Sequence, residues 1–163
     1  MILAGILVTS DKGSRGERLD GSGPVAAEIL RGIGAEIVCQ RVVPDDRETI
    51  AAALVEMADR LGLDLVVTSG GTGLGPRDCT PEATLQVIDR QVPGLAEAMR
   101  REGLKSTPRA MLSRAVAGVR GRTLIVNLPG SPRGVRENLG VILAALPHAV
   151  EVLRGEAGDC ARE

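Results

Sequence analysis

Residues 63–84 read LDLVVTSGGTGLGPRDCTPEAT and bring a strand, a glycine-rich turn, a lone carboxylate and a helix start into one run. Leu65, Val66 and Val67 form the short apolar run that a parallel strand buried on both faces requires. The glycines of GGTG allow a sharp turn and let a phosphate approach the backbone closely. Asp78 lies where phosphates would collect, and a shared Mg²⁺ explains a carboxylate there better than direct contact does. The stretch therefore predicts an anion site with Asp78 as a candidate metal ligand.

A helix start is predicted directly after this loop. Thr80 supplies a side-chain oxygen at the N-cap position, and Pro81 suits the first helical position. The unpaired N–H groups of that helix are expected to face the glycine turn.

The same order of strand, polar loop and helix start occurs twice more. Residues 2–9 are predicted to form a strand, followed by the loop SDKGSRGERLDGSG and a helix that opens at residues 22–24. Residues 123–128 form another predicted strand, followed by PGSP with Ser131 as cap and Pro132 at the first helical position. In an open α/β sheet such loops gather at the carboxyl edge of the strands, where ligands usually bind.

The rest of the chain alternates as a layered α/β fold should. Apolar periodicity and turn residues predict a strand at 35–43, helices at about 47–61, 93–103 and 108–113, a hairpin of 115–119 with 122–127, and a long helical pattern from 132 to about 153 that Pro147 breaks. The fold class is α/β, three-layered, with a mostly parallel sheet, an antiparallel excursion and helices on both faces. We expect a single domain over 1–163 with a frayed tail from about residue 155.

Composition argues against nucleic acid and membrane as partners. The chain has no Phe, Trp or Tyr and a formal net charge of −1, so it offers neither base stacking nor long-range attraction for a polyanion. No apolar stretch is long enough to span a membrane. Glu102 is the only acidic residue among the charged residues of the span 100–122, and the others are basic. The span is predicted either to hold a small anionic substrate or to be a solvated helix face.

Cysteine usage favours a reducing cytoplasm. Cys39, Cys79 and Cys160 are odd in number and contain no CxxC pair, which disfavours a disulfide framework or a zinc site. Cys79 lies in the central loop, but no histidine is near it in sequence to activate it as a nucleophile.

Two familiar nucleotide motifs are absent: GGTGLGPRD lacks the lysine and Ser/Thr of a Walker loop and the spacing of the dinucleotide fingerprint. Five blocks, in order, instead resemble the molybdopterin adenylyltransferases, the bacterial MogA/MoaB type and the G domains of plant and animal molybdenum-cofactor proteins. The blocks are SDKGSRGERLDGSGP at 10–24, VVPDD at 42–46, TSGGTGLGPRDCTPEAT at 68–84, LKSTPRAMLSR at 104–114 and NLPGSPRGVRENL at 127–139. Cys79 departs from the family motif, which usually has an aliphatic residue there.

The resemblance implies transfer of AMP from ATP to the terminal phosphate of molybdopterin, with Mg²⁺ as cofactor and pyrophosphate as product. It implies that Asp45 and Asp78 are catalytic and hold the metal, with Asp46 as a neighbour. It further implies substrate contacts from Ser10, Asp11, Ser14, Gly70, Gly71, Thr72, Gly73, Thr80, Ser113, Arg114, Pro129, Gly130, Ser131 and Pro132. A homotrimer is also implied, and a molybdenum-inserting enzyme is a candidate partner.

Plainer roles stay open for several of these residues. Asp45 could cap the helix after Pro44, Ser131 and Thr80 could be caps, and Ser113 with Arg114 could bond the carbonyls of a helix end. Two other functions also remain: a non-catalytic molybdopterin-binding or scaffolding protein, and a small-molecule phosphotransferase with the same cradle. Intact Asp45 and Asp78 count against the first, and the stretches SDKGSRG at 10–16 and LKSTPRAMLSR at 104–114 count against the second.

Overall fold

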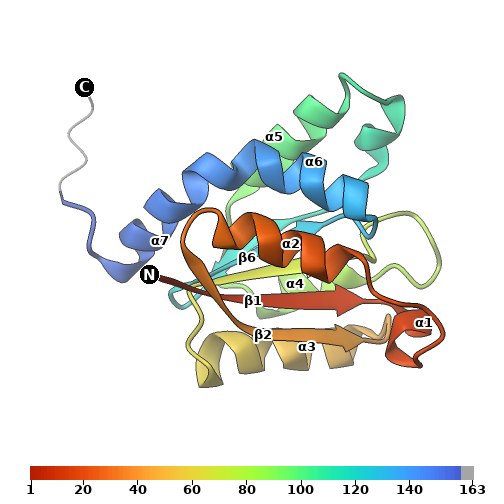
Figure 1. Ribbon diagram of the computed structural model, residues 1–163, viewed down its shortest axis with the longest axis horizontal. Helices are drawn as coiled ribbons and strands as arrows, with labels where there is room; N and C mark the ends of the chain where they lie inside the picture. Colours follow the sequence, from red (N-terminus) through yellow and green to blue (C-terminus); the bar gives the residue numbers. More distant parts are fainter. Residues whose placement is uncertain (159–163) are drawn as a thin grey trace.

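The computed structural model describes residues 1–158, and a six-stranded sheet of order β2-β1-β3-β6-β5-β4 runs through it (Figure 1). The strands are β1 (Ile2–Thr9), β2 (Ala35–Val43), β3 (Leu65–Ser69), β4 (Arg90–Gln91), β5 (Ala117–Arg120) and β6 (Thr123–Leu128). The first three and β6 are parallel, whereas β4 and β5 pair antiparallel. The predicted sheet, including its antiparallel part, is confirmed.

Helices cover both faces of this sheet. They are α1 (Asp11–Ser14), α2 (Ser22–Arg31), α3 (Arg47–Val55), α4 (Thr80–Val87), α5 (Pro93–Gly103), α6 (Pro132–Ile142) and α7 (Leu146–Arg154), with shorter turns η1 (Glu56–Arg60), η2 (Pro108–Leu112) and η3 (Leu143–Ala145). In Figure 1, α2, α5, α6 and α7 lie on one side of the sheet and α3 on the other. None of the helices in residues 1–158 is long and apolar enough to cross a membrane.

Two aliphatic cores fill the spaces between the layers. Adjacent residues of one strand point to opposite faces, so Ile6 and Leu65 enter the core under α2, α6 and α7, while Leu7 and Val66 enter the core over α3 and α4. Every residue of β3 and of β6 is buried. The continuous apolar runs of the sequence therefore mark the strands covered on both faces.

Several predicted elements differ in detail. The loop after β1 contains the short helix α1, the predicted helix at 47–61 ends in a π-helical turn, and the two-residue strand β4 was not predicted. Pro147 lies in the first turn of α7 and separates it from α6, as predicted. The predicted fraying from residue 155 falls partly on 159–163, which, with Cys160, lie outside the described residues.

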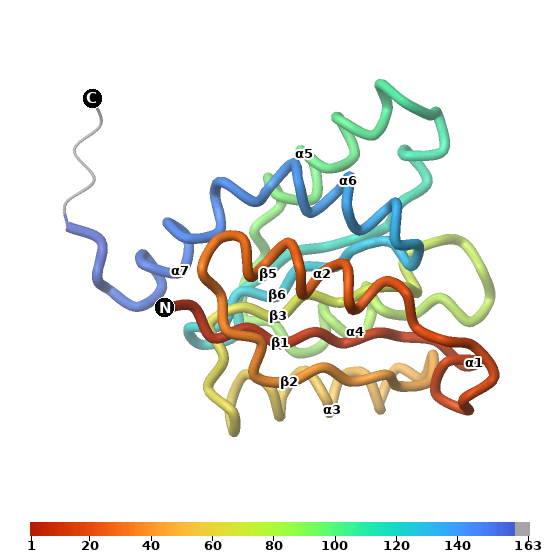
Figure 2. The backbone as a smooth tube through the Cα atoms, viewed as in Figure 1, coloured from red at the N-terminus to blue at the C-terminus, as the bar shows by residue number. Residues whose placement is uncertain are grey.

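The topology fixes where the polar loops meet. Ser69 is paired with Val8 on one side and with Leu128 on the other, so β1, β3 and β6 end level with one another. In Figure 2 the segments that follow these strands leave from the same end of the molecule as α1. The three loops singled out in the sequence therefore share one edge of the sheet.

Candidate functional site

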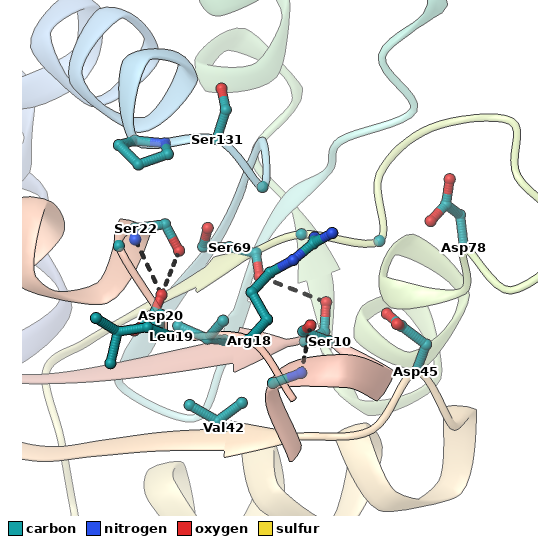
Figure 3. Close-up of a pocket in the computed structure, with 18 residues that line it drawn as sticks. Ser10, Arg18, Leu19, Asp20, Ser22, Val42, Asp45, Ser69, Asp78 and Ser131 are labelled. Atoms are coloured by element: carbon teal, nitrogen blue, oxygen red, sulfur yellow. Dashed lines mark hydrogen bonds between the residues drawn. The ribbon is translucent and has the colours of Figure 1, made fainter. Parts of the chain in front are cut away.

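A cavity of about 630 Å³ opens at this edge (Figure 3). The segments that follow β1, β2, β3 and β6 all contribute to its wall. The lining includes Ser10, Gly13, Arg18, Leu19, Asp20 and Gly21 after β1, Asp45 after β2, Gly70, Gly71 and Asp78 after β3, and Gly130, Ser131 and Pro132 after β6. Figure 3 shows Asp45 and Asp78 on the same side of the cavity. Segments far apart in sequence thus form one polar pocket.

The floor of the cavity is backbone that only glycine can supply. Gly70 and Gly71 have φ angles of 102° and 65°, which side-chain-bearing residues rarely adopt. A Cβ at Gly70 would overlap the carbonyl oxygen of Thr9, and one at Gly71 would overlap the hydroxyl of Thr80. The two glycines therefore expose peptide groups rather than side chains to a ligand.

Thr80 does not cap its helix, and this prediction is wrong. Helix α4 begins at Thr80 with Cys79 in the N-cap position, and no side chain bonds the free amides there. The Thr80 hydroxyl instead lies 3.1 Å from the hydroxyl of Thr9, below the glycine turn. Tertiary packing has drawn the side chain inward, which leaves the first amides of α4 without a side-chain acceptor.

Asp45 and Asp46 have separate tasks. Asp46 is the N-cap of α3 and accepts a hydrogen bond of 2.9 Å from the amide of Thr49. The alternative that Asp45 caps this helix is therefore wrong, because Asp46 is the residue that caps it. The Asp45 carboxylate lines the cavity instead, where burial raises its pKa and the charges of Asp11 and Asp78 add to the effect.

Asp11 joins the three segments around Asp45. Its carboxylate accepts a hydrogen bond of 3.0 Å from the Asp45 amide, and its own amide donates to the Asp45 carboxylate at 3.0 Å. Arg77 binds the same Asp11 carboxylate through two nitrogens, each at 3.1 Å, and thereby lowers the pKa of Asp11. Asp11 therefore connects the loops instead of lining the cavity.

The two predicted serines that follow β1, Ser10 and Ser14, differ in whether they line the cavity. The Ser10 side chain accepts from the amide of Gly13 at 2.9 Å and lines the cavity. Ser14 donates to the carbonyl of Asp11 at 2.8 Å and is exposed, outside the cavity wall.

Asp78 has no cationic partner among the described residues. One of its carboxylate oxygens accepts the amide of Gly75 at 2.9 Å, and the side chain lines the cavity. Within residues 1–158 no three His, Cys, Asp or Glu side chains are grouped to hold a metal. Asp45 and Asp78 fit a hard cation whose remaining ligands come from bound phosphate or water, which is how Mg²⁺ is usually held.

Two charged residues of the cavity wall, Arg18 and Asp20, were not predicted from the sequence. The Asp20 carboxylate accepts from the amides of Ser22 and Gly23 and orders the start of α2, and the spacing of Asp20 before Ser22 is a signal of that turn. Arg18 lines the cavity and forms no ion pair with any residue that the structure describes. No sequence pattern distinguished Arg18 from its neighbours.

A second cavity of about 520 Å³ is lined by four more of the predicted contacts. Its wall includes Thr72, Gly73, Ser113 and Pro129, and it shares Ser131 with the first cavity. Ser131 also caps α6 by accepting from the amide of Gly134 at 2.9 Å. The predicted site therefore divides into two neighbouring chambers.

The basic span does not form one patch. Arg100 and Arg109 both line the second cavity, and Arg100 also donates to the carbonyls of Ser113 and Ala115. Arg120 pairs with Asp59 at a different place. The Arg114 guanidinium bonds the carbonyls of Gly73 and Asp78 and pairs with Glu82, and it lies outside both cavity walls. Arg114 therefore holds this loop, and the carbonyls that it bonds are not those of a helix end.

Comparison with known proteins gives a consistent result. A family model described as "probable molybdopterin binding domain" matches residues 5–148. The molybdopterin adenylyltransferase of Helicobacter pylori strain J99 is 42% identical over 157 residues, which cover 93% of this chain and 87% of that protein. Gephyrin of Dictyostelium discoideum is 41% identical over 164 residues, but this chain spans only 23% of its length.

Solved structures share the same architecture. The molybdopterin biosynthesis enzyme MoaB of Thermus thermophilus superposes with a TM-score of 0.91 at 56% identity. The match covers 95% of this chain and 98% of that one.

Proposed function

The chain belongs to the molybdopterin adenylyltransferase family, and from this membership we infer that it is a nucleotidyltransferase of molybdenum cofactor biosynthesis. It transfers AMP from ATP to the terminal phosphate of molybdopterin. An oxygen of that phosphate attacks the α-phosphorus of ATP, the bond to the β-phosphate oxygen breaks, and adenylylated molybdopterin and pyrophosphate result. The observation that carries the assignment to this cavity is the pair of carboxylates, Asp45 and Asp78, beside a glycine floor.

Catalysis by this site is positioning and electrostatic stabilisation. Asp45 and Asp78 would hold Mg²⁺, which would neutralise the charge that moves onto the leaving pyrophosphate. The fit rests on their donor chemistry: both are oxygen ligands on one side of the cavity, and neither has an arginine or lysine partner among the described residues. Without a cation, these carboxylates would repel a polyphosphate.

The nucleotide is proposed to occupy the first cavity. Gly71 would offer its backbone N–H group to the phosphates, whereas the amide of Gly70 already donates to the carbonyl of Leu128 at 3.1 Å. The guanidinium of Arg18, which has no ion pair with the described residues, would add a positive charge. Gly130, Ser131 and Pro132 would wall the base on the other side through aliphatic contact, because the chain has no aromatic residue to stack on it.

The second cavity is proposed to hold the pterin. It adjoins the first through Ser131, so a phosphate at the boundary would be within reach of a nucleotide in the first chamber. Ser113, Thr72 and Gly73 would provide polar contacts, while Pro129 would pack on the ring.

The cellular setting is proposed from the family and the composition. We expect a homotrimer in the cytoplasm, with product passed to a molybdenum-inserting enzyme. The second candidate function, a protein that binds molybdopterin without turnover, would need no metal ligands, and Asp45 and Asp78 therefore count against it.

A pyrophosphate-release assay with ATP, Mg²⁺ and molybdopterin tests the proposal. Release should require both molybdopterin and Mg²⁺, and Asp78→Asn should abolish it while the thermal unfolding profile stays that of the wild type. Tight molybdopterin binding without release would support the scaffolding function instead. An unchanged rate in Asp78→Asn would exclude the metal role of Asp78.

A further inference from the structure

Residues 73–78 connect the glycine floor to α4 and include the proposed metal ligand Asp78. Residues 74–77 are exposed, and Leu74 is 67% exposed, so apolar packing does not fix this loop. Within the loop, Gly75 and Asp78 exchange two hydrogen bonds of 2.9 and 3.0 Å. These local bonds shape the turn but do not attach it to the rest of the molecule.

Arg114 attaches both ends of the loop at once. Its amide donates to the carbonyl of Thr72 at 2.9 Å, and its Nε donates to the carbonyl of Gly73 at 2.7 Å. At the far end of the loop its Nη2 donates to the carbonyl of Asp78 at 2.9 Å, and its Nη1 pairs with Glu82 in the first turn of α4. One residue from a distant part of the sequence therefore spans the whole loop.

The residue type matters for this arrangement. Arginine carries a rigid planar fork of five N–H donors, which can serve two carbonyls and a carboxylate at fixed spacing. Lysine has a single nitrogen and cannot reach acceptors at both ends of the loop. The ion pair between Arg77 and Asp11 also attaches the loop, but it holds the loop at one position, and the Arg77 side chain is 64% exposed. Arg114 is bonded at both ends of the loop.

We propose that Arg114 is a positioning residue for Asp78: it clamps the loop 73–78 so that the Asp78 carboxylate is presented to the cavity. This inference rests on the proposed function, because the position of Asp78 matters through the Mg²⁺ that it would hold. Removal of a group that hydrogen-bonds and orients a metal ligand typically lowers metal affinity or activity by about 10- to 100-fold.

The test uses Arg114→Lys, which keeps the charge and removes the fork. Arg120→Lys is a matched control, because Arg120 also joins a carbonyl, that of Val87, to a carboxylate, that of Asp59, but at the opposite edge of the sheet. Pyrophosphate release is measured against Mg²⁺, ATP and molybdopterin concentrations in turn. We expect Arg114→Lys to raise the half-saturating Mg²⁺ concentration about tenfold or more, with part of the rate restored at high Mg²⁺, and Arg120→Lys to match the wild type.

Other results of the same assays would contradict a positioning role of Arg114. A higher KM for molybdopterin with an unchanged Mg²⁺ dependence would assign Arg114 to direct substrate contact and overturn the clamp. If Arg114→Lys fails to fold, Glu82→Gln gives the second test, since it leaves the carbonyl contacts in place and weakens the ion pair. It should raise the half-saturating Mg²⁺ concentration in the same direction by a smaller factor, and no change would count against the clamp.

Amide hydrogen exchange separates failure of the clamp from failure of the proposed function. The amides of residues 73–79 should exchange faster in Arg114→Lys than in the wild type, with no such change in Arg120→Lys. This readout needs no turnover, so it remains informative if the wild type releases no pyrophosphate. Unchanged exchange in this loop would overturn the clamp.

Discussion

At the amino edge of the sheet Asp64 pairs with Arg154 and Asp59 pairs with Arg120, whereas at the carboxyl edge neither Asp45 nor Asp78 pairs with a described basic residue. Asp64 is 9% exposed and also accepts the amide of Leu3 at 2.7 Å. Burial would raise the pKa of Asp64, but the bonds from Arg154 and Leu3 outweigh it and lower that pKa.

The difference shows what each edge contributes. A buried carboxylate with a partner ties α7 to the start of β1 and supports the fold. A carboxylate without a cation, partly buried beside others of like charge, costs the folded state free energy unless a ligand supplies the missing charge. The amino edge therefore stabilises the fold, and the carboxyl edge carries the charge pattern expected of the proposed binding site.

The largest expected effect is on catalysis at the carboxyl edge. Asp45→Asn should lower the pyrophosphate-release rate by about 100-fold or more, equivalent to about 3 kcal/mol of transition-state stabilisation, because it removes a ligand of the proposed Mg²⁺. Its unfolding free energy should not fall, since no ion pair is removed. Asp46→Asn is the control: asparagine caps a helix as well as aspartate does, so rate and stability should both stay near wild type.

Equal losses of activity in Asp45→Asn and Asp46→Asn would contradict this division of tasks between neighbouring residues. A large loss of stability in Asp45→Asn alone would show that Asp45 supports the fold after all.

The amino edge should respond in the opposite way. Arg154→Ala should reduce the unfolding free energy by about 2 kcal/mol, because Asp64 is left nearly buried without its cation. Activity should be unchanged below the unfolding temperature. Chemical denaturation measures the loss, and Arg133→Ala, which removes an exposed pair with Glu137, should cost less than about 0.5 kcal/mol. Comparable losses in both variants would mean that the buried pair contributes no more than an exposed one.

The smallest expected effect is a pH dependence of opposite sign at the two edges. The pKa of Asp45 is raised in the folded state, so its ionised form destabilises the fold above that pKa, and this cost is relieved as the pH falls through it. The pKa of Asp64 is lowered, so its stabilisation is present above its unfolded value and is lost as the pH falls through the folded one.

Chemical denaturation of Asp45→Asn and of the wild type, from neutral pH to below the pKa of Asp45, measures how the ionisation of Asp45 changes the free energy of unfolding. At neutral pH the variant should be more stable than the wild type by about 0.5 kcal/mol after solvent screening, and the difference should vanish on acidification through the pKa of Asp45. A difference that stays constant with pH would exclude ionisation of Asp45 as its cause.

Much of the fold was predictable because its signals are local. The apolar runs of β3 and β6 require burial on both faces, and Pro147 ends one helix and begins another for steric reasons. The strand β4 carries no such signal: its two residues are exposed and depend on pairing with β5. The π-helical turn at the end of α3 likewise has no sequence pattern that distinguishes it from an ordinary helix.

The site was predictable to the level of its loops. The sequence located Asp45, Asp78 and the glycine turn, but residue patterns alone left it open whether Asp45 caps the helix that follows, because either of two adjacent carboxylates can do so. The sequence also predicted Thr80 as a cap. Its hydroxyl instead contacts that of Thr9, seventy-one positions away in the chain, and a local pattern cannot show such a contact.

The sequence by itself determined the fold class, the three strand–loop–helix units and the residues that could bind phosphate, because periodicity and turn chemistry act over a few neighbouring residues. Only the tertiary structure decided which carboxylates remain without a cation and which arginines are already engaged. The sequence pattern does not show that Arg114 is bonded to the loop it holds, whereas Arg18 lines the cavity without an ion pair to any described residue. That distinction depends on which distant groups packing brings within hydrogen-bonding distance, and no local pattern encodes it.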